Sequence, residues 1–179
     1  MNVTDGRLAP AAGSDGLVAR IPGAALFVAA RHPAPDVEAL LRTFTGVTDA
    51  TPGRALARAL AALVGADADT TLPGFAVVAA TPSGTYVKVF GSVEVQLQGP
   101  DGAETISGVG SFTGIDREVT GGFHTVAAHR AGEPAPAPAF DVDLTGGSAP
   151  AAGFALTVMT SPTDAPVADL PPATVPAPA

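Results

Sequence analysis

The sequence predicts an α+β fold with a mostly antiparallel sheet or a small β-barrel, and with two short helices inserted after the first hairpin. Two observations lead to this fold class. Between residues 35 and 65 the apolar residues recur with helical spacing, whereas from Phe75 onward they recur at every second position. No regular alternation of strand and helix patterns follows, which argues against a Rossmann-like fold.

The first two ordered segments are expected at Leu17–Ile21 and Ala24–Arg31. Pro22-Gly23 separates them, and this dipeptide favours a tight turn. We therefore predict a hairpin, with one bent strand as the alternative.

A first helix is predicted to begin at Pro35, because proline suits the first helical position and Asp36 and Glu38 complement the positive end of the helix dipole. Gly46 is a natural end for this helix. Its apolar residues form one stripe: Val37, Leu40, Leu41 and Phe44.

A second helix is predicted to begin after Thr51-Pro52 and to end at Gly65. Arg54 and Arg58 lie opposite its apolar stripe, as a solvated face or a binding patch. Each helix is expected to lay its stripe on a sheet. The stripe of the second helix comprises Leu56, Leu60, Leu63 and Val64.

A long strand is predicted over Thr85–Gln98, with a bulge or sharp bend at Gly91. Pro100-Asp101-Gly102 is typical of a hairpin turn, so Glu104–Ile115 is expected to return antiparallel. Five valine and leucine side chains of the long strand share one face: Val87, Val89, Val93, Val95 and Leu97. Further strands are expected over Phe75–Ala80, Phe123–His129, Phe140–Leu144 and Phe154–Met159.

The domain organisation follows from composition. Residues 1–15 are expected to form a flexible amino-terminal segment, and residues 16–161 a single globular domain. Residues 162–179 are rich in proline and alanine and contain no aromatic residue. Such a segment predicts an extended, semi-rigid linker or tail.

Charge and residue usage exclude several classes of function. The chain has 9 basic and 17 acidic residues, a net charge of −8 and no cluster of Lys or Arg, which argues against a nucleic-acid partner. It has no cysteine. The longest apolar run, residues 24–30, is too short for a membrane span, and the amino terminus does not fit a signal peptide. We expect no membrane insertion and a cytoplasmic location.

No catalytic, cofactor-binding or metal-ligating residue is assigned, and no cofactor is expected. Residues 108–114 contain three glycines without the spacing of a phosphate-binding loop, so a turn or bulged strand is the better interpretation. His124 and His129 are separated by an odd number of strand positions, which places them on opposite faces. Asp141 and Asp143 share a face and could bind calcium, but exposed strand charge is the simpler explanation.

The remaining candidates are charged or nucleophilic side chains. Ser107, His124 and Asp116 supply the residue types of a catalytic triad, yet the nucleophile-elbow context is missing. Asp116, Arg117 and Glu118 are most simply a solvated, locally paired charge cluster. They are also the interaction patch that we select from the sequence.

A set of local motifs resembles a domain at the amino end of actinobacterial forkhead-associated (FHA) domain proteins. The resemblance covers about residues 16–160 and depends on Phe75–Leu97, Ile106-Ser107-Gly108, Thr113, Ile115-Asp116-Arg117, Asp143-Leu144 and Gly153-Phe154-Ala155-Leu156. It implies that a Pro/Ala-rich linker and a phosphothreonine-binding domain follow, and that the protein is associated with Ser/Thr kinase signalling. The family pattern carries tryptophan where this chain has Gly114.

The expected function is a non-enzymatic interaction or scaffolding domain that binds another protein and is tethered to a signalling module such as an FHA domain. The alternative is a small-molecule-binding or enzymatic β-barrel, since small inner side chains can leave room for a ligand. The sequence does not identify the partner or the oligomeric state.

Overall fold

The computed structural model describes residues 6–30, 34–65, 72–137 and 143–158. It contains two helices and two antiparallel sheets, which are not closed into a barrel. The α+β prediction is confirmed, and the barrel alternative is wrong. The Pro/Ala-rich segment predicted over residues 162–179 lies outside the described residues.

The larger sheet has six strands in the order β10-β2-β3-β4-β5-β8, and the smaller sheet has five in the order β1-β11-β9-β6-β7. The strands of the larger sheet span Gly147–Pro150 (β10), Leu17–Ile21 (β2), Ala24–Val28 (β3), Phe75–Ala80 (β4), Thr85–Phe90 (β5) and Ile115–Val119 (β8). Those of the smaller sheet span Arg7–Pro10 (β1), Gly153–Thr157 (β11), Thr125–Arg130 (β9), Val93–Gly99 (β6) and Gly102–Ser107 (β7).

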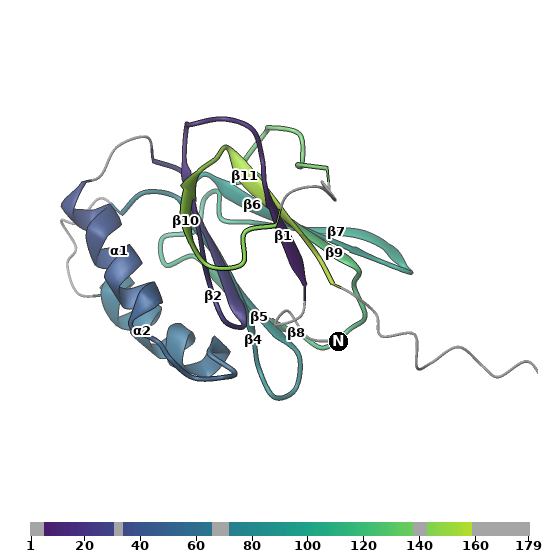
Figure 1. Ribbon diagram of the computed structural model, residues 1–179, viewed down its shortest axis with the longest axis horizontal. Coiled ribbons are helices and arrows are strands. Elements are labelled where there is room, and N and C mark those ends of the chain that lie inside the picture. Colours follow the sequence, from purple (N-terminus) through teal and green to yellow (C-terminus); the bar gives the residue numbers. More distant parts are fainter. Residues whose placement is uncertain (1–5, 31–33, 66–71, 138–142, 159–179) are drawn as a thin grey trace, which may run out of the picture.

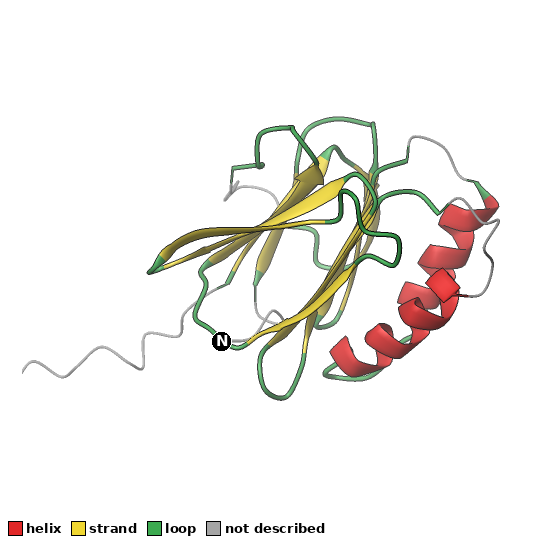
Figure 2. Ribbon diagram, turned by 180° about the vertical axis from the view of Figure 1, so that it is seen from behind, coloured by secondary structure: helices red, strands yellow, loops and turns green. Residues whose placement is uncertain are grey.

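Helices α1 (Pro35–Thr45) and α2 (Gly53–Gly65) cover the outer face of the six-stranded sheet, and the five-stranded sheet covers its inner face (Figures 1 and 2). The molecule therefore has three layers. Both predicted helices are confirmed, with Pro35 in the first turn of α1 and Gly46 at its end.

Strand alternation divides the larger sheet between two cores. In β4, Phe75, Val77 and Ala79 pack under the helices, while Ala76, Val78 and Ala80 face the five-stranded sheet. Every residue of β3 and β4 is buried. Since neither face of these strands meets water, their sequences read as continuous apolar runs.

The strand predicted over Thr85–Gln98 is two strands and not one, and the sharp bend predicted at Gly91 is confirmed. The chain turns at Gly91, where φ is +68°, and passes from β5 in one sheet to β6 in the other. The residues predicted to share one apolar face of this segment do so in the structure. Val87 and Val89 of β5 face the same inter-sheet core as Val93, Val95 and Leu97 of β6.

Three further expectations need correction. The return strand over Glu104–Ile115 ends at Ser107, and Ile115 begins β8 in the other sheet. The flexible segment expected over residues 1–15 includes an ordered strand, because Arg7–Pro10 pair with β11. Asp143 and Leu144, the described part of the strand expected over Phe140–Leu144, are not in a strand.

At Gly53, the first residue of α2, the helix backbone lies close against the end of β4. A Cβ atom at this position would lie 2.5 Å from the Thr81 side chain and 2.8 Å from the Ala80 carbonyl oxygen. Gly65, at the other end of the same helix, has no atom within 4 Å of such a Cβ.

We predict that Gly53→Ala lowers the free energy of unfolding by about 1–3 kcal/mol, because overpacking outweighs the better helix propensity of alanine. Gly65→Ala is the matched control and should leave stability unchanged or raise it by up to about 1 kcal/mol. Urea unfolding of the two variants and the wild type measures both effects. Equal stabilisation by both substitutions would contradict the observed approach of α2 to β4.

Candidate functional site

The predicted patch, Asp116, Arg117 and Glu118, lies in β8 at one edge of the six-stranded sheet. Within the described residues, β5 is the only strand that pairs with β8. All three side chains are exposed. An edge strand of this kind leaves one row of backbone N–H and C=O groups without ladder partners, which makes it competent to pair with another chain.

The three residues do not share one face. In the register of the sheet, Asp116 lies opposite Lys88, and Glu118 opposite Tyr86, so these carboxylates project on the side that carries the helices. Arg117 lies opposite Val87 and projects on the inter-sheet side. The three residues were expected to pair with one another. Instead, each is bonded to a residue of another element.

Asp116 holds a buried lysine. The Lys88 ammonium lies 2.7 Å from Asp116 Oδ2, and Lys88 is only 1% exposed. The Tyr86 hydroxyl donates to Asp116 Oδ1. Removing one partner of a buried ion pair costs about 3–5 kcal/mol, because the other charge is left buried and unpaired. The contact between Lys88 and Asp116 therefore holds β8 against β5.

Tyr86 stays a neutral donor in this cluster. Its burial, and then the hydrogen bond to Asp116 and the negative charge of that carboxylate, raise the pKa of the phenol well above its ordinary value. As a neutral phenol, Tyr86 donates its hydroxyl proton to Asp116 Oδ1, while the ammonium of Lys88 pairs with Oδ2. Lys88 also lies 3.4 Å from the Thr113 carbonyl oxygen, at the end of the loop before β8.

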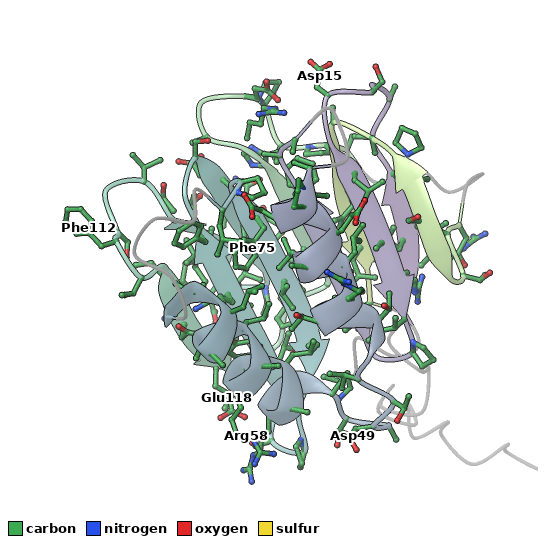
Figure 3. The ribbon with its side chains drawn as sticks, turned by 90° about the vertical axis from the view of Figure 1, so that its left-hand side faces the viewer. Asp15, Asp49, Arg58, Phe75, Phe112 and Glu118 are labelled. Atoms are coloured by element: carbon green, nitrogen blue, oxygen red, sulfur yellow. The ribbon has the colours of Figure 1, made fainter. Side chains whose placement is uncertain are left out.

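Glu118 is held by hydroxyl groups of the β4–β5 turn. Ser83 Oγ and Thr81 Oγ1 donate to its Oε1 over 2.5 Å and 2.7 Å. These two hydrogen bonds, with a smaller effect of the Arg54 charge on α2, hold the pKa of Glu118 below its usual 4.5. Glu118 and Arg58 lie at the same end of the molecule in Figure 3.

Arg117 connects the two sheets at their edges. Its guanidinium donates to Glu104 on β7, and both side chains are about half exposed. An exposed ion pair contributes at most about 1 kcal/mol. Its main effect here is on orientation, because it turns Arg117 toward β7.

The loop between β7 and β8, residues 108–114, presents the most exposed large apolar side chain of the described residues. Phe112 is 98% exposed and Val109 60% exposed. Figure 3 shows Phe112 at the tip of this loop, pointing away from the body of the protein. The turn predicted for this segment is confirmed. No pattern in the sequence predicts that Phe112 faces water.

Hydrogen bonds fix the loop that carries Phe112. The Gly108 N–H donates to the Val93 carbonyl over 2.9 Å, and Ser111 Oγ donates to the Gly114 carbonyl over 3.0 Å. Gly114 has φ of +79°, and a Cβ there would lie 2.6 Å from the Val89 carbonyl oxygen. The tryptophan of the FHA-associated pattern does not fit this backbone.

The remaining sequence candidates do not converge on a chemical centre. Among the described residues, no group of three or more His, Cys, Asp or Glu side chains is placed to hold a metal ion. Asp143 accepts from the Leu8 N–H over 2.9 Å and pairs with Arg20 at 3.1 Å. Asp141 lies outside the described residues.

The two histidines do not form a site, and the three residue types of a catalytic triad are not brought together either. His124 precedes β9, whereas His129 is buried within it and its Nδ1 lies 2.9 Å from the Arg130 carbonyl oxygen. Ser107 closes β7 in the five-stranded sheet, while Asp116 is bonded to Lys88 in the other. No interaction joins Ser107, His124 and Asp116 among the described residues.

A hollow of about 230 Å³ lies between the tip of the β6–β7 hairpin and the chain that follows β8. Its lining includes the apolar side chains of Leu97, Val119 and Phe123 and the acidic side chains of Asp101 and Glu104. No helix of the described segments has the length and apolar character needed to span a membrane.

Compared with known proteins, the chain matches no protein-family model, no curated protein and no solved structure. The fold and the geometry of β8 are therefore the basis for a functional proposal.

We predict that Ser83→Ala and Thr81→Val each raise the pKa of Glu118 toward 4.5, with the larger effect from Ser83→Ala. Because the folded-state pKa is lowered, the contribution of Glu118 to stability is present above its unfolded pKa and is lost as the pH falls through the folded value. Carboxyl-carbon NMR titration measures the pKa directly. An unchanged midpoint in both variants would show that the hydroxyl groups do not hold the carboxylate.

Proposed function

We propose that this chain is a non-enzymatic protein-interaction or scaffolding module, and that it docks a protein partner through the loop 108–114 and the neighbouring strand β8. The observation that carries the proposal is the nearly complete exposure of Phe112. Aromatic side chains dominate the binding energy of protein interfaces when a partner buries them. Val109 in the same loop and Ile115 at the start of β8 are also exposed apolar side chains, at 60% and 39%.

The loop supports this role because it is ordered before any partner arrives. Internal hydrogen bonds and the contact of Thr113 with Lys88 fix the backbone on both sides of Phe112. A partner that binds a pre-organised loop loses less conformational entropy in the complex. The exposed ring thus has the properties of an anchor and not only of a solvated side chain.

We further propose that the module is tethered to a signalling domain, such as a phosphothreonine-binding FHA domain, in the cytoplasm. The Pro/Ala composition of residues 162–179 and the resemblance to FHA-associated domains support this tether. A semi-rigid tether raises the effective concentration of the bound partner near the second domain. The net charge of −8 favours proteins over nucleic acids as partners.

The alternative, a small-molecule-binding or enzymatic domain, has less support. The space between the sheets is filled by apolar side chains of both sheets. Ligand pockets commonly enclose about 300–1,000 Å³, and the hollow beside the β6–β7 hairpin has about 230 Å³.

The test compares partner capture by the wild type and by Phe112→Ser. Biotinylated protein is incubated with native lysate of the source cells, and retained proteins are quantified by mass spectrometry. We expect one reproducible partner with the wild type and a loss of at least about tenfold with Phe112→Ser, as for a central aromatic anchor. Ala61→Ser, on the exposed side of α2, is the matched surface control.

Both variants should unfold at the wild-type temperature, because neither position is buried. Equal capture by Phe112→Ser and the wild type would contradict docking through this loop. Failure of the wild type to retain any partner would count against an interaction module altogether.

A further inference from the structure

We propose that β8 binds an extended segment of the partner as an additional antiparallel or parallel strand, and that this segment carries basic residues opposite Asp116 and Glu118 and an acidic residue opposite Arg117. The inference rests on the proposed function, since it assumes a protein partner. It adds the mode of binding and the charge pattern of the partner segment.

The backbone of β8 is available for this pairing. β8 closes one side of the six-stranded sheet, and none of the other described strands pairs with its outer edge. Its five side chains include none that is buried. Strand addition at such an edge obtains affinity from main-chain hydrogen bonds and specificity from alternate side chains.

The edge is held in place by interactions on its inner side. Lys88 and Tyr86 of β5 bind Asp116, and the β4–β5 turn binds Glu118. A partner strand therefore meets a fixed template, and no element of the described fold has to move before it pairs. This rigidity reduces the entropy lost on binding.

A second copy of this chain is a poor occupant. A two-fold axis at the centre of an antiparallel β8–β8 pair would place Arg117 opposite Arg117 and Asp116 opposite Glu118. Moving the axis to a neighbouring residue of the same strand would oppose Asp116 to itself, or Glu118 to itself. Like charges in directly opposed positions destabilise a sheet, so the charges of β8 disfavour pairing between identical chains.

A complementary strand meets the opposite situation. Asp116 receives one hydrogen bond at each carboxylate oxygen, which leaves lone pairs on both. Glu118 receives both hydroxyl groups at Oε1, and Oε2 has no hydrogen bond among the described residues. Both carboxylates lie on the helix-facing side two residues apart, which matches cations at alternate positions of an extended segment.

Arg117 sets the requirement for the other face. It projects on the inter-sheet side with Ile115 and Val119, and Glu104 already binds one edge of its guanidinium. An acidic residue flanked by two aliphatic residues would complement these three side chains. The favoured segment thus alternates aliphatic, basic, acidic, basic and aliphatic residues.

The probe is an acetylated and amidated peptide, Thr-Val-Lys-Glu-Lys-Val-Thr, whose palindromic pattern fits either strand direction. The control is the charge-exchanged peptide Thr-Val-Glu-Lys-Glu-Val-Thr. Each is titrated into the full ¹⁵N-labelled chain at low salt. We expect the probe to shift the amide signals of residues 115–119 and to bind roughly tenfold more tightly than the control, because opposed charge pairs each change affinity by about two- to fivefold.

Backbone pairing is tested with two N-methylated probes, one methylated at every odd position and one at every even position. The N–H groups of a strand point alternately to its two sides. One methylated probe should therefore lose binding, and the other should keep it. Retention by both would mean that charge alone attracts the peptide and would overturn strand addition.

Glu118→Lys in the protein provides the reciprocal test. We expect this variant to lower the preference for the probe from roughly tenfold to about twofold, because two of the three opposed charge pairs stay favourable. The hydrogen bonds from Thr81 and Ser83 to position 118 are lost, so the native amide spectrum of the variant is the check that it is folded. Ala61→Ser again serves as the surface control. An unchanged preference would contradict the assigned role of Glu118.

The result is separable from the proposed function. If Phe112→Ser abolishes partner capture while neither peptide binds and Glu118→Lys captures the partner normally, docking occurs at the loop and the strand-addition proposal fails. If the probe binds with the expected pattern but Phe112→Ser captures the partner normally, the loop is not the anchor and the edge strand remains the binding element.

Discussion

Burial of both faces of the six-stranded sheet is the constraint on which the rest of the structure depends. Helices α1 and α2 cover one face and the five-stranded sheet covers the other, so alternate residues of β3 and β4 enter two separate cores. A shift of one residue in any central strand would exchange the contents of the two cores. The register of the sheet is thereby fixed from its centre to β8.

At β8 this cover ends, and polar interactions replace apolar burial. Lys88 occupies a position on β5 that an apolar residue would fill in a central strand, and Asp116 neutralises it from the edge. The same lysine lies near the Thr113 carbonyl, which links the edge strand to the loop that exposes Phe112. One buried cation thus connects the two elements for which we propose a role in binding.

The elements that could be predicted from the sequence are those with periodic apolar residues. The first hairpin and both helices follow from Pro22-Gly23 and from the leucine stripes. The passage from β5 to β6 could not be predicted, because Val89 and Val93 face one core whether the chain continues or changes sheet. Strands β8 and β10 are short edge strands without a buried residue, so they carry no apolar signal. The edge strand β1 has only two buried apolar residues, Leu8 and Ala9, too few to form a periodic pattern. The contact between Lys88 and Asp116 spans 28 residues and depends on strand order, which local patterns do not contain.

Native-state hydrogen exchange of the full chain tests most directly whether β8 is an open edge on a rigid sheet. We predict that amides of β3 and β4 exchange only through global unfolding, while residues 115–119 alternate between protected amides that face β5 and rapidly exchanging amides that face outward. Uniform protection across residues 115–119 would mean that the edge is covered in the free protein. Rapid exchange at all five would mean that β8 is not held against β5, and either result would contradict the account.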